Sequence, residues 1–224
     1  MTFIEMLLDT HVHELPLELE TIRDAVTGEI VGRETRWNLP NTWSTEEYGL
    51  VDRWALRSAI AIASEFAHER PAALVHVDVR SIAAGESARE LYQWLRGLRQ
   101  KAGDPRLALE IDERFVLPFA ETLAGFSRAV RRIGFEVVID HVQEPPAIGD
   151  VLKNLQCDAV KIDASLIGSL ATSIPARESA ARIVRAAHAL GMYAIAAGVH
   201  DAQTWDYARD LGCDRIQGRA VSPI

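Results

Sequence analysis

The 224-residue sequence has only two cysteines and no long run of apolar residues. Cys157 and Cys213 lack metal-site spacing and are too few for a disulfide scaffold, which indicates a reducing compartment. No apolar run approaches the roughly 18 residues that a membrane-spanning helix needs, and the N-terminus lacks the basic and then apolar pattern of a secretory signal. We therefore expect a cytoplasmic protein that does not enter a membrane.

Positive charge is also scarce. The chain carries 24 Lys and Arg against 32 Asp and Glu, so its formal net charge is −8. Because nucleic acids and anionic membrane surfaces repel such a protein, we predict neither as a partner. One anionic ligand is still compatible with this charge, particularly if a metal ion bridges it. The length suits one large domain or two small ones.

Strand-like apolar segments alternate with helical patterns along most of the chain. The expected strands span residues 15–22, 29–37, 73–80, 106–113, 135–142, 158–165, 192–199 and 215–221. The expected helices span residues 45–68, 87–101, 117–132, 147–154, 175–190 and 201–211. Strands separated by such helices predict right-handed parallel crossovers. Eight such strands predict a TIM-type (β/α)₈ barrel with its site at the C-terminal ends of the strands. A doubly wound open sheet is the alternative.

The first two expected strands are an exception, because only residues 24–28 separate them. A connection this short predicts a hairpin, in which one of the two strands runs antiparallel.

Ionisable and amide side chains gather at the predicted strand ends. They are Glu34, Asp78, Glu110, Asp112, Glu113, Asp140, His141, Lys161, Asp163, His200 and Gln217. Carboxylates from four strands that meet at one barrel mouth repel one another unless a cation lies among them or some are protonated. Each could instead cap the helix that follows it, but four strands in series favour a shared site.

The order of the motifs resembles the EAL-domain phosphodiesterases, which hydrolyse cyclic di-GMP. The matching segments are "TGEIVGRET", "VHVDVRS", "LALEIDE", "VVIDHV", "CDAVKIDASLI", "AHALGMYAIAAGVHD" and "LGCDRIQGRAVSPI". The resemblance assigns residues 15–224 to a degenerate EAL domain and residues 1–14 to an N-terminal extension. It implies a (β/α)₈ barrel of the EAL kind with an antiparallel first strand.

The resemblance also implies a Mg²⁺ or Mn²⁺ site. Its ligands would be Glu34, Glu110 and Asp140, with Asp78 where the family has a metal-binding Asn. Lys161 matches a catalytic Lys that orients the attacking water, and Gln217 matches a site Gln. Glu113 matches a Glu that anchors the loop after strand five.

Several positions depart from the family pattern. His141 replaces a second Asp and Ala197 replaces a Glu, and in the family those carboxylates complete a second metal position. Asn38 replaces an Arg that contacts a ligand phosphate, and Arg36 is the candidate substitute because strand periodicity puts it on the face of Glu34. We expect at most a single metal site, for one Mg²⁺ or Ca²⁺, that can also be empty.

The loop after strand five is "DHVQEPPAIG" in place of the glycine-rich "DDFGTGYSSL" of the family. Pro145 and Pro146 fix two φ angles, which predicts a stiff connector rather than a loop that rearranges. In the family this region lies at a dimer contact. We therefore predict that Val142, Ile148 and Val151 supply apolar contacts to a second copy or to another protein.

These features together predict a catalytically inactive regulator that acts through protein–protein contact and requires no cofactor. Lys161 would be vestigial, and cyclic di-GMP would bind weakly through Arg36 and Gln217. The first alternative is a weak metal-dependent phosphodiesterase that retains Glu34, Glu110, Asp140 and Lys161. A second alternative rests on His11 and His13, whose His-x-His spacing resembles the zinc motif of amidohydrolases.

Overall fold

The computed structural model describes residues 17–37, 45–65, 74–78, 85–102, 106–143 and 149–219. The predicted N-terminal extension, the His11 and His13 pair and the Pro145–Pro146 connector lie outside these residues. Ile148 lies outside them as well, and no side-chain position is described for Asp78 or Val151.

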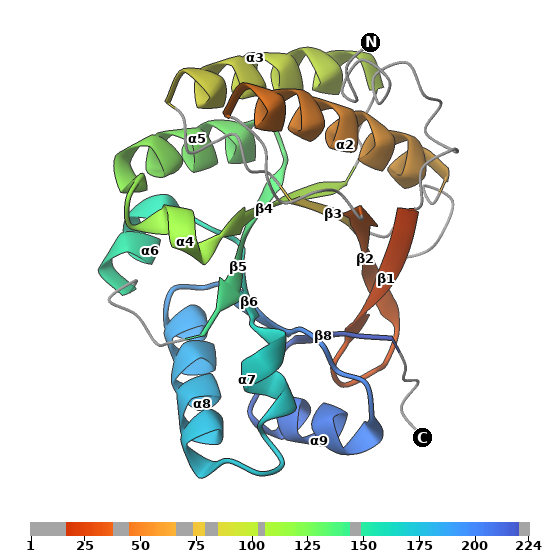
Figure 1. Cartoon of the computed structure of the whole chain (residues 1–224), viewed down its shortest axis with the longest axis vertical. Coiled ribbons are helices and arrows are strands. Elements are labelled where there is room, and N and C mark those ends of the chain that lie inside the picture. Colours follow the sequence, from red (N-terminus) through yellow and green to blue (C-terminus); the bar gives the residue numbers. More distant parts are fainter. Residues whose placement is uncertain are drawn as a thin grey trace.

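The described strands form one closed barrel in the order β1 to β8 (Figure 1). They are β1 Leu17–Asp24, β2 Ile30–Trp37, β3 Leu74–Asp78, β4 Leu107–Asp112, β5 Glu136–Val142, β6 Ala159–Ile162, β7 Tyr193–Ala196 and β8 Arg215–Gln217. Pairing of β1 with β8 completes the ring. The barrel prediction is therefore confirmed, and the alternative of a doubly wound open sheet is wrong.

Strand β1 runs antiparallel to both of its neighbours, as the short connection predicted. The turn forms because the Asp24 carboxylate accepts hydrogen bonds from the backbone N–H groups of Val26 and Thr27, at 2.9 and 2.7 Å. Gly28 then adopts a φ of 72°, a left-handed conformation that favours glycine. The resulting register places Glu20 directly opposite Glu34.

Helices cover the outside of the barrel in the described part of the chain (Figure 1). They are α2 Thr45–Glu65, α3 Gly85–Ala102, α4 Glu113–Val116, α5 Ala120–Arg132, α6 Gly149–Leu155, α7 Ala164–Gly168, α8 Ile174–Ala189 and α9 Ala202–Asp210. None of the described helices is long and apolar enough to cross a membrane.

The short helices α4 and α7 correct the sequence-based boundaries. The predicted strands 106–113 and 158–165 end early because Asp112 and Asp163 act as N-caps. Their carboxylates accept hydrogen bonds from the N–H groups of Arg114 and Ser165, each at 2.8 Å. Such a bond satisfies one of the free N–H donors of a helix start, which favours a turn of helix over further strand.

Two apolar clusters stabilise the barrel. The larger one fills the space between the strands and the helices, and the smaller one fills the barrel interior. The interior cluster consists of Ile22, Ala108, Val138, Ala159 and Ile195. Because side chains two residues apart in a strand share a face, these residues fix which side chains lie in the next interior layer.

Candidate functional site

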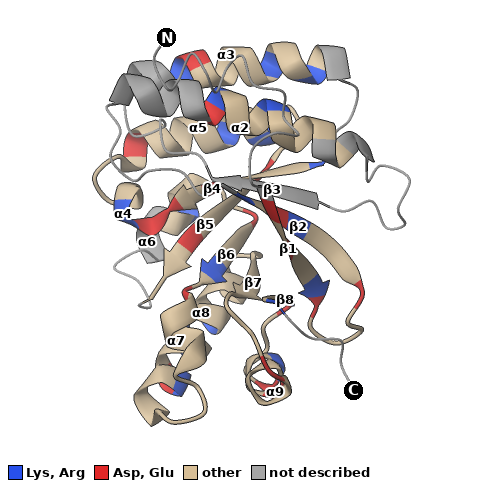
Figure 2. Cartoon of the chain, turned by 45° about the vertical axis from the view of Figure 1, so that its right-hand side comes forward, with Lys and Arg blue, Asp and Glu red and all other residues tan. Residues whose placement is uncertain are grey.

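A polar layer lies directly above the interior apolar cluster. Two residues beyond Ala108, Val138 and Ala159 stand Glu110, Asp140 and Lys161. On the antiparallel β1, two residues before Ile22, stands Glu20. Figure 2 shows acidic positions on β2 and β5 and a basic position on β6. Because residues two apart in a strand point to the same face, the polar residues of the strand-end motifs lie together in one layer.

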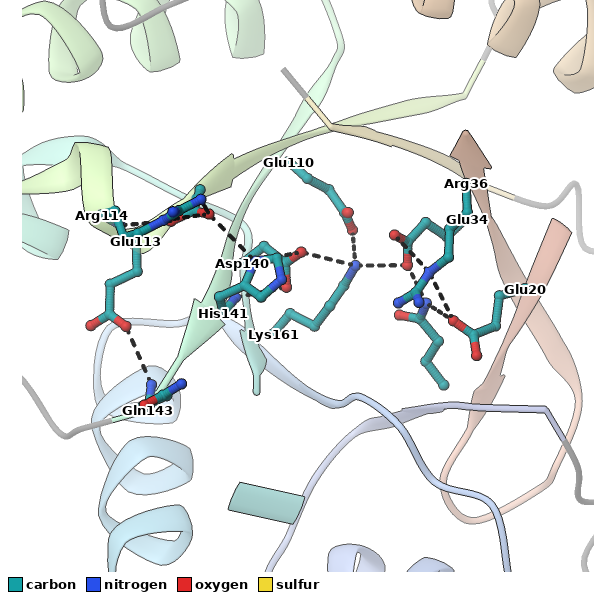
Figure 3. A network of polar contacts seen from close by, with 12 residues as sticks. Glu20, Glu34, Arg36, Glu110, Glu113, Arg114, Asp140, His141, Gln143 and Lys161 are labelled. Carbon is teal, nitrogen blue, oxygen red and sulfur yellow. Dashed lines mark hydrogen bonds and ion pairs between the residues drawn. The ribbon is translucent and has the colours of Figure 1, made fainter. Parts of the chain in front are cut away.

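Lys161 stands at the centre of this layer (Figure 3). Its Nζ donates to Glu34 Oε2 at 3.0 Å, forms an ion pair with Glu110 Oε1 and lies 3.7 Å from Asp140 Oδ2. Its side chain is only 1% exposed. Burial alone would lower the pKa of Lys161, but the charges of Glu110, Glu34 and Asp140 outweigh it and raise the pKa. The ammonium group therefore stays charged.

Glu34 is bound from two sides. Arg36 Nε lies 3.3 Å from Glu34 Oε1 and 3.2 Å from Glu20 Oε2. The Gln217 amide donates to Glu20 at 2.8 Å and also to Glu34. Burial would raise the pKa of Glu34, but the positive charges of Lys161 and Arg36 hold it at about 2. Arg36 thus shares the face of Glu34, as predicted, whereas its contact with a phosphate stays a prediction.

Asp140 is a carboxylate whose charged form is disfavoured in this layer. Burial raises its pKa to about 6, and the charge of Glu110 adds to this, although Lys161 opposes it. Its Oδ1 accepts a hydrogen bond from the N–H of His141 at 2.7 Å. The Asp140 carboxyl group therefore takes up a proton at a higher pH than an ordinary Asp does.

His141 turns away from the barrel interior. Its φ of 62° lies in the left-handed region, which costs a non-glycine residue about 1 kcal/mol, and the pairing of β5 with β6 shifts register at this point. The ring is 59% exposed, with Nδ1 3.3 Å from Asp140 Oδ2 and 3.7 Å from Asp112 Oδ2. His141 therefore lies at the rim of the site.

Strand β7 contributes little that could bind a cation. Ala197, which follows it, is buried and has no side-chain donor atom. The His200 ring accepts a hydrogen bond from the Arg219 backbone N–H, at 3.4 Å between Nδ1 and N. The segment after β7 thus offers a methyl group at Ala197 and, at His200, a ring that contacts backbone.

The predicted metal site does not fit the described side chains as they stand. Glu34, Glu110 and Asp140 supply the hard oxygen donors that Mg²⁺ and Ca²⁺ prefer. However, their oxygens converge on Lys161 Nζ, and no group of three His, Cys, Asp or Glu is placed to hold a metal among the described residues. The side chain of Asp78 is not described. The single-metal site stays a prediction.

Other predicted residues have separate outcomes. Glu113 Oε2 accepts a hydrogen bond from the Gln143 N–H at 3.3 Å, which holds the end of β5, but the loop that follows is not described. Val142 is 2% exposed and packs in the main core. This burial corrects the prediction that Val142 contacts a partner, because the strand directs its side chain towards the helices. The contacts expected of Ile148 and Val151 stay predictions.

Sequence reasoning missed two residues of the site. Glu20 was overlooked because its place depends on the hairpin register, although counting back from the turn at Asp24 would have paired it with Glu34. Arg114 was overlooked because it falls between the expected strand 106–113 and the expected helix 117–132. Its guanidinium forms two-point contacts with Asp112, at 2.7 to 3.0 Å, and so neutralises a carboxylate at the rim.

Comparison with known proteins identifies the family to which this chain is similar and the solved structures that share its fold. A sequence model of the EAL domain matches residues 7–223. The chain is 26% identical over 185 residues to the cyclic di-GMP phosphodiesterase NbdA of Pseudomonas aeruginosa, an alignment that covers 79% of this chain and 23% of that protein. The chain spans 30% and 23% of the lengths of two curated relatives, so their full-length activities do not transfer directly.

Two solved structures share the fold. The PaMucR phosphodiesterase in complex with c-di-GMP has a TM-score of 0.80 and 21% identity, with 97% of this chain and 95% of that chain covered. The Vibrio cholerae LapD S helix-GGDEF-EAL structure, bound to c-di-GMP, has a TM-score of 0.77 and 18% identity, with 97% and 56% covered.

Proposed function

This chain belongs to the EAL domain family, and on that premise we propose that it is a regulatory member that does not hydrolyse cyclic di-GMP. The observation that carries the proposal is the composition of the layer around Lys161. A two-metal displacement needs carboxylates that hold both ions near the attacking and leaving oxygens. Here Ala197 supplies no donor atom, His141 lies at the rim, and the remaining carboxylates contact an ammonium group.

We propose that this regulator binds cyclic di-GMP only weakly. PaMucR and LapD are both seen with c-di-GMP bound, which makes this dinucleotide the first ligand to test. Arg36 is the cation best placed for a phosphate, since its side chain is 51% exposed. However, Arg36 already contacts Glu20 and Glu34, so a phosphate would compete with two carboxylates for the guanidinium.

We further propose that the output of the barrel is a contact with protein, either a second copy or another chain. Because Val142 lies in the core, the residues that we still propose for this contact are Ile148 and Val151, at the start of α6. The net charge of −8 favours a partner surface that is not itself strongly acidic.

A second candidate function is slow metal-dependent hydrolysis of cyclic di-GMP. The observation that favours it is the convergence of Glu34, Glu110 and Asp140 on a single point. This candidate keeps Lys161 beside the three carboxylates, as the family pattern does.

A paired experiment separates the two functions. Cyclic di-GMP is titrated into the protein by calorimetry with and without Mg²⁺, and the same samples are assayed by chromatography for the linear dinucleotide. We expect product formation at least about 10²-fold slower than in an active phosphodiesterase of the family, because loss of metal ligands or of a general base typically costs 10²–10⁴ in rate.

Arg36→Ala is the matched variant for the titration. This variant should show no binding heat and, like the wild type, should form no linear dinucleotide. Steady conversion to the linear dinucleotide at rates normal for the family, dependent on Mg²⁺, would instead establish the second candidate.

A further inference from the structure

Glu20 is the carboxylate of the polar layer that comes from the antiparallel strand β1. It is paired directly with Glu34 of β2, and its side chain is only 12% exposed. Two carboxylates that face each other across neighbouring strands repel each other. The pair is stabilised because the Arg36 guanidinium lies against both carboxylates (Figure 3). The Gln217 amide also donates to both.

We propose that Glu20 is the specificity-determining residue of this site, because its carboxylate engages Arg36 and Gln217 and so keeps anionic ligands, phosphodiesters among them, from binding tightly. The inference rests on the proposed function, since it names the residue that makes the binding of cyclic di-GMP weak. Glu20 is not among the predicted metal ligands, so the inference is independent of whether a metal ion occupies the site.

The first argument concerns the donors that an anionic ligand would need. Arg36 Nε lies 3.2 Å from Glu20 Oε2, and the Gln217 amide nitrogen donates to the same oxygen at 2.8 Å. Arg36 and Gln217 are the two residues that we expect to contact the ligand. A guanidinium binds a phosphate best through two parallel N–H groups, and Nε is one of the donors available for such a pair. One oxygen of Glu20 thus engages a donor of each residue.

The second argument concerns the cost of freeing the guanidinium. The Glu20 side chain is largely buried, whereas the Arg36 side chain is half exposed. If a phosphate draws Arg36 away, Glu20 keeps its negative charge, loses a compensating positive charge and still faces Glu34. Loss of one partner from a buried ion pair is strongly destabilising, unlike loss of an exposed pair. The contact between Arg36 and the ligand must offset this cost.

The third argument concerns repulsion between Glu20 and the ligand itself. A phosphodiester that contacts Arg36 comes close to the carboxylate that contacts the same guanidinium. Juxtaposed like charges are a strong means of excluding the wrong ligand from a binding site. A neutral side chain of the same shape would remove both the repulsion and the competition for Arg36.

The test is a gain of cyclic di-GMP binding in Glu20→Gln. This substitution keeps the shape of the side chain and an oxygen that can accept from Gln217, and it removes the charge. Glu29→Gln is the matched control, because it makes the same change at an exposed residue of the hairpin and alters the net charge by the same amount. Each protein is titrated with cyclic di-GMP by calorimetry at one fixed salt concentration.

We expect Glu20→Gln to bind cyclic di-GMP at least about tenfold more tightly than wild type does, because a like charge beside the ligand is removed. Where wild type shows no binding heat, measurable heat in Glu20→Gln is the expected gain. Glu29→Gln should behave as wild type does. The double variant Glu20→Gln, Arg36→Ala should lose the gain, since the donor that the substitution frees is then absent.

Three results would overturn the inference. They are a folded Glu20→Gln protein that binds no more tightly than wild type, an equal gain in Glu29→Gln, and a gain that survives the loss of Arg36. Glu20→Ala covers the case in which Glu20→Gln does not fold. It removes the carboxylate outright, so the same gain and the same dependence on Arg36 are expected of it, and unchanged affinity in the folded protein contradicts the inference.

Failure of the proposed function is seen separately, in the wild type alone. Tight binding of cyclic di-GMP by wild type, or its conversion to the linear dinucleotide, would refute the proposed function. The role of Glu20 is judged instead by the ratio of the affinities of wild type and Glu20→Gln, which neither result determines.

Discussion

Asp140 shows how a single buried side chain can link the site to stability. Burial and the charge of Glu110 raise its pKa to about 6 in the folded protein, against 3.8 for an ordinary Asp. Between these values the folded state keeps a proton that the unfolded chain has released. Stability therefore falls as the pH rises from about 4 to about 6, because the unfolded state binds fewer protons in that window.

Substitution Asp140→Asn should remove this dependence. Wild type is expected to lose on the order of 2 kcal/mol of unfolding free energy between pH 4.5 and pH 6.5, roughly in proportion to the raised pKa. The variant should show a nearly flat profile there, as measured by urea unfolding at several pH values. Asp201→Asn is the control, because Asp201 caps α9 and its pKa is lowered, so its contribution changes only at more acidic pH. Parallel profiles for wild type and Asp140→Asn would contradict the shift.

Among the elements, the junction between β7 and α9 is set by a close approach of backbone. Gly198 has a φ of +72°, and a Cβ added there would lie 2.5 Å from the Cβ of Ala164, the first residue of α7. The junction thus brings the end of β7 against the helix that follows β6. This contact holds Ala197 next to the site and leaves no room for a larger residue at position 198.

The substitution Gly198→Ala should cost about 2 kcal/mol or more, because it combines left-handed backbone strain with a steric overlap. Gly125→Ala is the matched control. Gly125 lies within α5, where an added Cβ meets no atom within 4 Å, so the change should stabilise by about 0.5–1 kcal/mol. Thermal unfolding of both variants checks the prediction, and equal melting temperatures for the two would disprove it.

Elements were more predictable from the sequence than the site was. The eight strands follow from apolar periodicity and from the turn at Asp24, both of which are local signals. The strand ends were misplaced where Asp112 and Asp163 cap short helices. A hydrophobic pattern does not show whether the backbone there continues a strand or begins a capped helix. Lys161 was predicted as a site residue, but its central position depends on side chains from β2, β4, β5 and β6 at once. The position of Glu20 in the layer depends in the same way on the register between β1 and β2.

At the scale of the whole molecule, closure of the barrel joins segments that are far apart in sequence. Ile22 of β1 pairs with Gln217 of β8, and the Trp205 indole of α9 donates to the Ala25 carbonyl at 3.2 Å. A closed barrel leaves no free strand edge for another chain to extend. A protein contact must therefore use helices or loops, which is consistent with the surface proposed at the start of α6.

The helix α6 supports a specific version of that proposal. Leu152 and Leu155 are buried and fix the face of α6 that packs on the core. Val151 precedes Leu152 by one residue, about 100° round the helix, and Ile148 directly precedes α6. We propose that Ile148 and Val151 supply the apolar contact to a partner.

The double variant Ile148→Asp, Val151→Asp tests this surface. If a second copy binds here, the wild type should have the mass of a dimer by light scattering, and the variant should have the mass of a monomer, since a buried charge without a partner costs several kcal/mol. The control is Val26→Asp, Ile174→Asp, which makes the same chemical changes at side chains that are 78% and 65% exposed on the hairpin turn and on α8. The control should leave the mass unchanged. If the variant keeps its circular dichroism spectrum and has the mass of the wild type, then α6 is not where copies of this barrel meet. If the wild type is itself a monomer, the partner proposed for this surface is a different protein.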